Sequence, residues 1–312
     1  VRSSAASDVY KRQYDMYTSL VGKKSPKYTF EQSKAIALEA LQVMGPDYVK
    51  HVHEAFDGRW IDVVENQFKR SGGYSSGTYD TNPFILLNWK DNLDNLYTLI
   101  HETGHSMHSY YSHHNQPYQY GDYSIFVAEI ASTTNENILT DYLLNKFKDD
   151  DEMKKFILNY YLDGFKGTVF RQTQFAEFEQ FIHEQDAKGQ PLTASFMDQA
   201  YRDLNAKYYG DAVISDDEIS LEWARIPHFY YNFYVYQYAT GFAAASTLAD
   251  GIVNGGQENV DRYLTYLKSG SSDTPTNVMK KAGVDMTQPD YLEKAFIIFE
   301  ERLNEFEALY EK

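Results

Sequence analysis

The pattern of apolar and polar positions changes twice along the chain. From Tyr28 to about residue 56, apolar residues recur every three or four positions, which predicts two helices separated by Gly45–Pro46. Thr29, followed three residues later by Gln32, is typical of a capping box at the start of the first helix. Short runs of β-branched and aromatic residues around glycine-rich turns then predict strands at 60–64, 74–79 and 84–88.

Helical periodicity covers most of the remaining chain. We find no internal repeat or composition break in residues 14–312, so we expect one mainly α domain with a small β-sheet. Residues 1–13 have neither a helical period nor an apolar run, and we expect a disordered or non-native leader, with native sequence missing upstream. The spans with helical periodicity are 92–114, 124–147, 152–187, 193–209, 217–250, 256–268 and 289–311.

Composition narrows the classes of function. The 45 acidic residues outweigh the 29 basic ones and leave a net charge of -16, which disfavours nucleic acid and anionic membranes as partners. No apolar run approaches the roughly 20 residues of a transmembrane helix. The lack of cysteine excludes disulfides, thiolate metal ligands and a cysteine nucleophile. Together with the lack of a recognisable signal segment, it favours a cytoplasmic location.

Residues 101–105 read His-Glu-Thr-Gly-His and carry the clearest chemical signal. His101 and His105 lie four residues apart, so on a helix both imidazoles project from one face and can bind one zinc ion. Glu102 can accept a proton from a metal-bound water, whose pKa zinc lowers towards 7. Histidines in an apolar helix are more often structural, but two that bracket a glutamate favour a metal. Gly104 leaves room for substrate or a neighbouring helix.

A catalytic zinc usually has three protein ligands and one open position, so two histidines leave the site incomplete. We favour Glu129 as the third ligand, because it lies on a helix that returns antiparallel after the loop at 117–122. The alternative, an ordinary exposed glutamate, fits poorly with its apolar neighbours. Other residues near the site are His108, His113 and His114, which are the alternative ligands, and Ser132, Thr133 and Glu136, which can support the ligands.

Longer motifs around these residues resemble oligoendopeptidase F, of the thimet oligopeptidase family of zinc metallopeptidases. The similarity runs from about residue 14 to the end, and family members are about twice this length. The chain therefore resembles their C-terminal catalytic part. The motifs are TLIHETGHSMHSYY at 98–111, QPYQYGDYSIFVAEIASTTNE at 116–136, RSGGYSSGTY at 70–79, GTVFRQT at 167–173 and EWARIPHFYY at 222–231.

The resemblance implies a fold and a set of site residues. The fold is a mainly helical, zincin-like catalytic domain with a small β-sheet beside the zinc-binding helix. The implied ligands of one Zn²⁺ per chain are His101, His105 and Glu129, and the implied general base is Glu102. Thermolysin-like peptidases place an aspartate four residues after the glutamate ligand, where this chain has Thr133, so the residues that support the ligands must differ.

The glycine- and serine-rich segment 70–79 is a mobile loop or an exposed strand edge. An edge can hydrogen-bond a peptide backbone by strand addition, and the resemblance implies this role. We expect Gly73, Tyr74 and Ser75 to bind substrate.

Five tyrosines follow Pro227, which we expect to begin a helix. Aromatic residues at helical spacing more often belong to a core, but a tyrosine hydroxyl or a histidine can stabilise the oxyanion of peptide hydrolysis. The resemblance implies a histidine followed by tyrosines in this role. His228 matches it, and we favour Tyr234 and Tyr238 as catalytic tyrosines, with Tyr231 binding substrate.

These observations predict a zinc-dependent oligoendopeptidase that hydrolyses internal bonds of short peptides. One alternative is an exopeptidase of the same group that removes C-terminal dipeptides. Another is a peptide-binding scaffold with a vestigial metal site, which zinc analysis would distinguish. The predicted partners are short peptides, and neither nucleic acid nor a membrane is expected.

Overall fold

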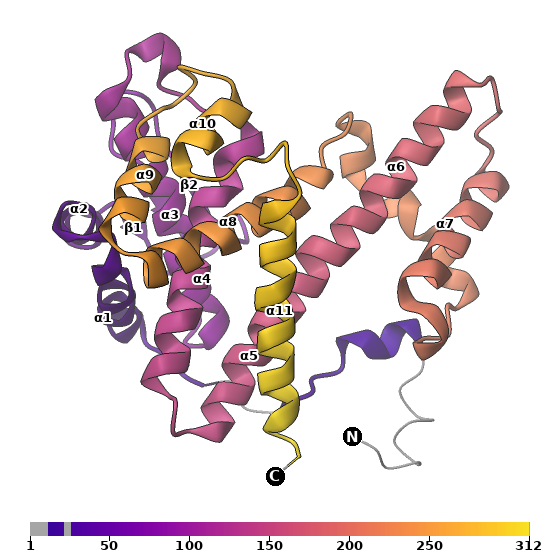
Figure 1. Ribbon diagram of the computed structural model, residues 1–312, viewed down its shortest axis with the longest axis horizontal. Coiled ribbons are helices and arrows are strands. Elements are labelled where there is room, and N and C mark those ends of the chain that lie inside the picture. Colours follow the sequence, from indigo (N-terminus) through magenta and orange to yellow (C-terminus); the bar gives the residue numbers. More distant parts are fainter. Residues whose placement is uncertain (1–11, 22–25, 312) are drawn as a thin grey trace.

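The computed structural model describes residues 12–21 and 26–311, which are mainly helical, as predicted (Figure 1). The α-helices are α1 (Phe30–Ala40), α2 (Pro46–Asp57), α3 (Leu93–Asn115), α4 (Ile125–Lys146), α5 (Asp151–Phe165), α6 (Arg171–Ala187), α7 (Ala194–Tyr209), α8 (Tyr236–Gly255), α9 (Gln257–Leu267), α10 (Pro275–Ala282) and α11 (Asp290–Ala308). Short 3₁₀ helices are η1 (Gln13–Tyr17), η2 (Leu41–Met44), η3 (Tyr118–Tyr120), η5 (Gly210–Ala212), η6 (Asp217–Arg225) and η7 (Pro227–Tyr230). A π-helical segment, η4 (Lys166–Phe170), joins α5 to α6, so the predicted span 152–187 is one continuous helical run.

The expected leader lies largely outside the described residues, since the structure describes nothing before residue 12. Arg12 and Gln13, which the leader included, contact the folded chain. Arg12 pairs with Asp216 at 2.6 Å, and buried Gln13 accepts a hydrogen bond from Asn205. The domain boundary at residue 14 stays a prediction.

The helices α3 and α4 pack closely beside each other at the centre of the molecule. A methyl group added at Gly104 of α3 would lie 2.6 Å from the Cα atom of Ser132 on α4. That distance is a steric clash between two carbon atoms. Gly104 therefore makes room for a neighbouring helix, one of the two roles the sequence left open. The capping box of Thr29 and Gln32 at the start of α1 is also confirmed.

The sheet has three short strands, β1 (Ile61–Asp62), β2 (Tyr74–Ser76) and β3 (Phe84–Leu86). β3 is central, parallel to β1 and antiparallel to β2, so β2 is an edge strand. β2 ends earlier than the predicted residue 79, because hydrogen bonds between Thr78 and Thr81 form a turn there. The hydroxyls of Ser75 on β2 and Ser106 on α3 lie 2.8 Å apart, which holds the edge strand beside α3.

Two main groups of buried apolar residues stabilise the described part of the chain, beside a third, minor group of Leu158, Phe306 and Leu309. The larger one fills the space between α1 to α5, the sheet and α8 to α11. The smaller one contains Phe175, Phe178, Tyr201, Ile226 and Val235. We call residues 171–235, which carry this smaller group, the arm. Figure 1 shows α6 and α7 of the arm extending away from α1 to α4.

Tyrosines with hydrogen-bonded hydroxyls fill much of the larger core. Tyr48, Tyr97 and Tyr266 are fully buried, and their hydroxyl groups meet Asn135, Thr140 and the Val127 carbonyl at 2.7–3.1 Å. Burial of these large rings is favourable because the polar end of each one keeps a partner.

The predicted helix over 217–250 is wrong in its first half. Residues 217–230 form η6 and η7, a bend follows at 231–235, and α8 begins only at Tyr236. Asn232 and Phe233 have left-handed φ angles of 51° and 61°, which a right-handed helix excludes. The physical reason is a tertiary contact, because the Phe233 N–H donates to Glu179 of α6 instead of to a carbonyl one turn back. The short helix α10 was not predicted.

No helix within 12–21 and 26–311 has the combined length and apolar character that crossing a bilayer requires.

Candidate active site

Helices α3 and α4 bring the three predicted metal ligands together. His101 Nε2 lies 3.4 Å from Glu129 Oε2, and His105 Nε2 lies 3.5 Å from the same oxygen. The two imidazole nitrogens are 3.1 Å apart. Within the described residues, these three side chains form the only group of histidine and carboxylate ligands close enough to hold one metal ion.

These distances fit a zinc ion. Four ligands at about 2.0–2.1 Å in a tetrahedron place neighbouring donor atoms about 3.3 Å apart. The three separations of 3.1 to 3.5 Å meet this requirement. Imidazole and carboxylate donors are a ligand set that zinc commonly takes, and three protein ligands leave one coordination position open. The ligand set present in the chain is therefore complete for a catalytic zinc.

Two further side chains of α4 fix the ligands. Glu136 Oε1 lies 2.6 Å from His101 Nδ1, so the Nδ1–H donates to the carboxylate and Nε2 is left free to face Glu129. Ser132 donates a hydrogen bond to Glu129 Oε2 at 3.2 Å. Both were expected to support the ligands. Thr133, the third residue expected there, lines the adjacent cavity.

The charges in this cluster shift its pKa values strongly. Burial alone would disfavour protonated His101, but the carboxylates of Glu136, Glu129 and Glu102 outweigh it and raise the His101 pKa. For Glu129, burial is again outweighed, and hydrogen bonds from the two histidines lower its pKa. The ionised carboxylates thus create a negative potential around the imidazoles, which favours a bound cation.

Glu102 lies in a different environment from Glu129. It is 6% exposed, and its Oε2 atom has no hydrogen-bond partner among the described residues. Burial raises the pKa of Glu102, although the neighbouring histidines oppose the shift. A buried carboxylate oxygen without a partner is costly, so it indicates a group that interacts with something outside the protein chain. Water or substrate at the ligand cluster can supply that interaction.

The edge strand β2 begins beside Glu102. A methyl group added at Gly73 would lie 3.0 Å from Thr98 Cγ2 and 3.6 Å from Glu102 Oε1. The backbone of Gly73 therefore approaches α3 next to the carboxylate. Ser75 faces α3 through its contact with Ser106. The side chain of Tyr74 instead lines a separate cavity together with Phe84, so only its backbone is available on the edge that borders the site.

The predicted aromatic residues meet, although the helix expected to align them is absent. The His228 ring stacks on Tyr234 at 5.6 Å and lies 5.8 Å from Tyr231 and 6.1 Å from Tyr238. Tyr234 and Tyr238 are 5.5 Å apart, edge to face. Burial, followed by a hydrogen bond with Tyr234, raises the pKa of Tyr238, and the charge of Glu129 adds to the shift. We refer to these four residues as the aromatic cluster.

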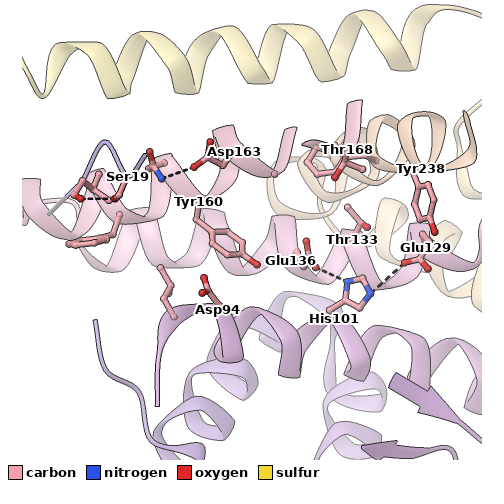
Figure 2. Close-up of a pocket in the computed structure, with 16 residues that line it drawn as sticks. Ser19, Asp94, His101, Glu129, Thr133, Glu136, Tyr160, Asp163, Thr168 and Tyr238 are labelled. Atoms are coloured by element: carbon pink, nitrogen blue, oxygen red, sulfur yellow. Dashed lines mark hydrogen bonds and ion pairs between the residues drawn. The ribbon is translucent and has the colours of Figure 1, made fainter. Parts of the chain in front are cut away.

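Tyr238 joins the aromatic cluster to the metal ligands. A cavity of about 760 Å³ is lined by His101, Glu129 and Tyr238, and Figure 2 shows Tyr238 above Glu129. Tyr160 and Asp163 of α5, which the sequence did not single out, also line this cavity, on the side of His101 away from Tyr238 (Figure 2). The residues next to them in the sequence form no recognisable motif. They reach the cavity only because α5 passes beside the site. A pocket of this volume is typical of a site for a small ligand.

The alternative ligands His108, His113 and His114, all on α3, do not belong to the ligand cluster. The contacts of His108 explain why. Its buried ring stacks on Tyr123 at 3.6 Å and contacts Tyr266. Burial lowers the pKa of His108, so it is a neutral core residue.

The chain is similar to known proteins over nearly its whole length. Group B oligopeptidase PepB from Streptococcus agalactiae is 59% identical over 301 residues, and oligopeptidase PepF from Bacillus subtilis is 54% identical over 299. Each match covers 96% of this chain but only 50% and 44% of the relative. The chain therefore spans about half the length of these relatives.

Solved structures show the same similarity. A crystal structure of oligoendopeptidase-F from Enterococcus faecium aligns with a TM-score of 0.74 and 48% identity, covering 97% of this chain and 47% of that one. A candidate peptidase from Chlamydophila abortus aligns with a TM-score of 0.87 and 42% identity, over 96% and 50%. The model of peptidase family M3 matches residues 5–298. The chain belongs to peptidase family M3.

Proposed function

We propose that this chain is the catalytic part of a zinc-dependent oligoendopeptidase that hydrolyses internal bonds of short peptides. The observation that carries the proposal is the cluster of His101, His105 and Glu129 donor atoms, with the unpartnered Glu102 carboxylate beside it. Similarity to oligopeptidases over 96% of the chain supports the same substrate class.

The three ligands would hold one zinc ion, which acidifies water and polarises a peptide carbonyl when bound. Glu102 accepts a proton from the attacking water, and its buried position with a raised pKa suits both this step and the return of the proton to the leaving nitrogen. Glu136 keeps His101 in the tautomer that presents Nε2 to the ligand cluster.

The remaining groups bind the peptide and stabilise the transition state. Because β2 is an edge strand, the backbone groups of Gly73, Tyr74 and Ser75 can pair with an extended peptide. Hydroxyl groups of Tyr234 and Tyr238, with His228, can donate to the oxyanion that forms on the scissile carbonyl. Tyr231 is exposed beside them and can contact the substrate.

Substitution of Glu102 tests this function. Glu102→Gln keeps the side-chain volume and leaves the ligands intact, so we expect one zinc per chain and a loss of at least about 1000-fold in kcat for a quenched fluorescent peptide. Glu152→Gln, the same change at an exposed glutamate on α5, is the matched control. Turnover retained by Glu102→Gln would overturn the mechanism, and a wild-type chain without stoichiometric zinc would favour a peptide-binding scaffold.

Blocked peptides separate endopeptidase from exopeptidase activity. We expect peptides blocked at both the amino and the carboxyl end to be cleaved as well as free ones. Loss of cleavage on carboxyl-terminal blocking alone would instead indicate removal of C-terminal dipeptides.

A cytoplasmic location stays a prediction from the sequence, and cell fractionation tests it.

A further inference from the structure

One buried carboxylate holds the bend at 231–235 onto helix α6. Glu179 is 1% exposed, and its Oε1 accepts the backbone N–H of Phe233 at 2.7 Å. The Phe233 ring also packs over His183, one turn further along α6, with ring centroids 4.5 Å apart. The bend is thereby attached to α6 before the chain enters α8.

The bend requires such an anchor because its backbone conformation is unfavourable. Asn232 and Phe233 are consecutive left-handed residues, and a bulky side chain such as Phe disfavours that conformation. Phe233 is 42% exposed, so burial of its own ring contributes little. Its N–H belongs to no helix or strand, and a charged acceptor is a strong partner for it.

The bend in turn determines where the aromatic cluster lies. Tyr231 and Tyr234 directly flank the two left-handed residues. The Tyr234 ring stacks on His228 with an interplanar angle of 29° and meets Tyr238 nearly at right angles, at 72°. If the two φ angles returned to the usual right-handed region, Tyr234 would move relative to both partners.

We propose that Glu179 is a positioning residue, which fixes the left-handed bend and so holds Tyr234 against His228 and Tyr238. The part of this inference that concerns catalysis rests on the proposed function, whereas the part that concerns the bend does not. The competing interpretation is that Glu179 only stabilises the arm.

Hydrogen exchange tests the anchor without any need for activity. In Glu179→Ala, we expect the Phe233 amide to exchange at least about tenfold faster, while exchange in α3 and α4 is unchanged. Glu179→Gln retains an acceptor oxygen and should keep the exchange within about threefold of wild type. Glu184→Ala, an exposed glutamate on the same helix, is the matched control. Unchanged exchange of Phe233 in Glu179→Ala would overturn the inference.

Kinetics then test the positioning role. We expect Glu179→Ala to lower kcat about tenfold with full zinc content and a KM within about twofold of wild type, and Glu179→Gln to recover most of the loss. In a Tyr234→Phe background, Glu179→Ala should cause no further loss, because both changes act through the same hydroxyl. An equal loss in both backgrounds would refute positioning and leave a purely structural role. A wild-type chain that cleaves no peptide would count against the proposed function, while the exchange experiment still decides on the anchor.

Discussion

The α3–α4 pair and the arm both supply residues of the predicted site, but they fix them by different means. On α3 and α4, the ligands lie on two regular helices in the large core, and spacing along each helix already sets their direction. In the arm, His228 lies on the short 3₁₀ helix η7, and Tyr231 and Tyr234 lie in the bend, supported by a smaller apolar group. Tyr238 follows on α8.

The two regions therefore differ in what holds their site residues in place. Two left-handed residues in the bend cost about 1–3 kcal/mol each, which buried polar contacts of the arm must offset. Besides Glu179, these contacts include Glu222, which meets Arg171, Arg225 and Tyr201. We therefore expect metal binding to depend on the α3–α4 pair alone, and the aromatic cluster to depend on ionic contacts of the arm.

The largest expected effect on stability comes from the buried carboxylate of Glu222. Glu222→Ala leaves the mostly buried Arg171 guanidinium and the buried Tyr201 hydroxyl without their partner, so we expect the arm to lose about 3 kcal/mol of stability. Urea unfolding and limited proteolysis of the arm measure this loss, and zinc binding should stay unchanged. Asp217→Ala removes an exposed ion pair with Arg202 and should change stability by less than about 0.5 kcal/mol. Weakened zinc binding in Glu222→Ala would show that the two regions are not independent.

A substitution at the α3–α4 contact should instead weaken zinc binding as well as stability. Gly104→Ala places a methyl group against the backbone of Ala131 and Ser132, so the helices must separate, at a cost of about 2 kcal/mol and with weaker zinc binding. Calorimetry with and without zinc measures both effects. Gly164→Ala, where an added methyl meets no neighbouring atom within 4 Å, is the control and should not destabilise the chain. Full zinc affinity in Gly104→Ala would contradict the role of the helix contact.

The smallest expected effect is on metal affinity alone. Glu136→Gln weakens the hydrogen bond to His101 Nδ1 but leaves every ligand in place, so we expect about a tenfold loss of zinc affinity. Competition with a zinc-binding dye measures the change, with Glu152→Gln as the control at an exposed position. An unchanged affinity would mean that helix packing alone orients the imidazole.

Prediction from the sequence succeeded where side-chain direction follows from local helix geometry. The spacing of His101 and His105 placed both on one face of α3, and Glu129 and Glu136 faced them from the next helix. The capping box of Thr29 and Gln32 was also predicted correctly, because its hydrogen bonds join residues only three positions apart. The glycine- and serine-rich segment 70–79, which we interpreted as a mobile loop or an exposed strand edge, contains the edge strand β2.

Prediction from the sequence failed where contacts with residues far along the chain determine the local backbone conformation. Aromatic residues at helical spacing predicted a continuous helix through 231–238, yet Glu179, more than fifty residues earlier, accepts the N–H of Phe233 and stabilises a bend. Tyr160 and Asp163 gave no signal, since only the path of α5 brings them to the cavity.

The sequence by itself therefore determined the candidate chemistry of this protein only within one helix: His101, Glu102 and His105 lie on neighbouring turns of α3, whose geometry is local, whereas Glu129 comes from α4. Only the tertiary structure decided how β2, α5 and the aromatic cluster surround that chemistry. Their positions depend on contacts between residues far apart in the chain, such as Ser75 with Ser106 and Glu179 with Phe233, which no periodicity encodes.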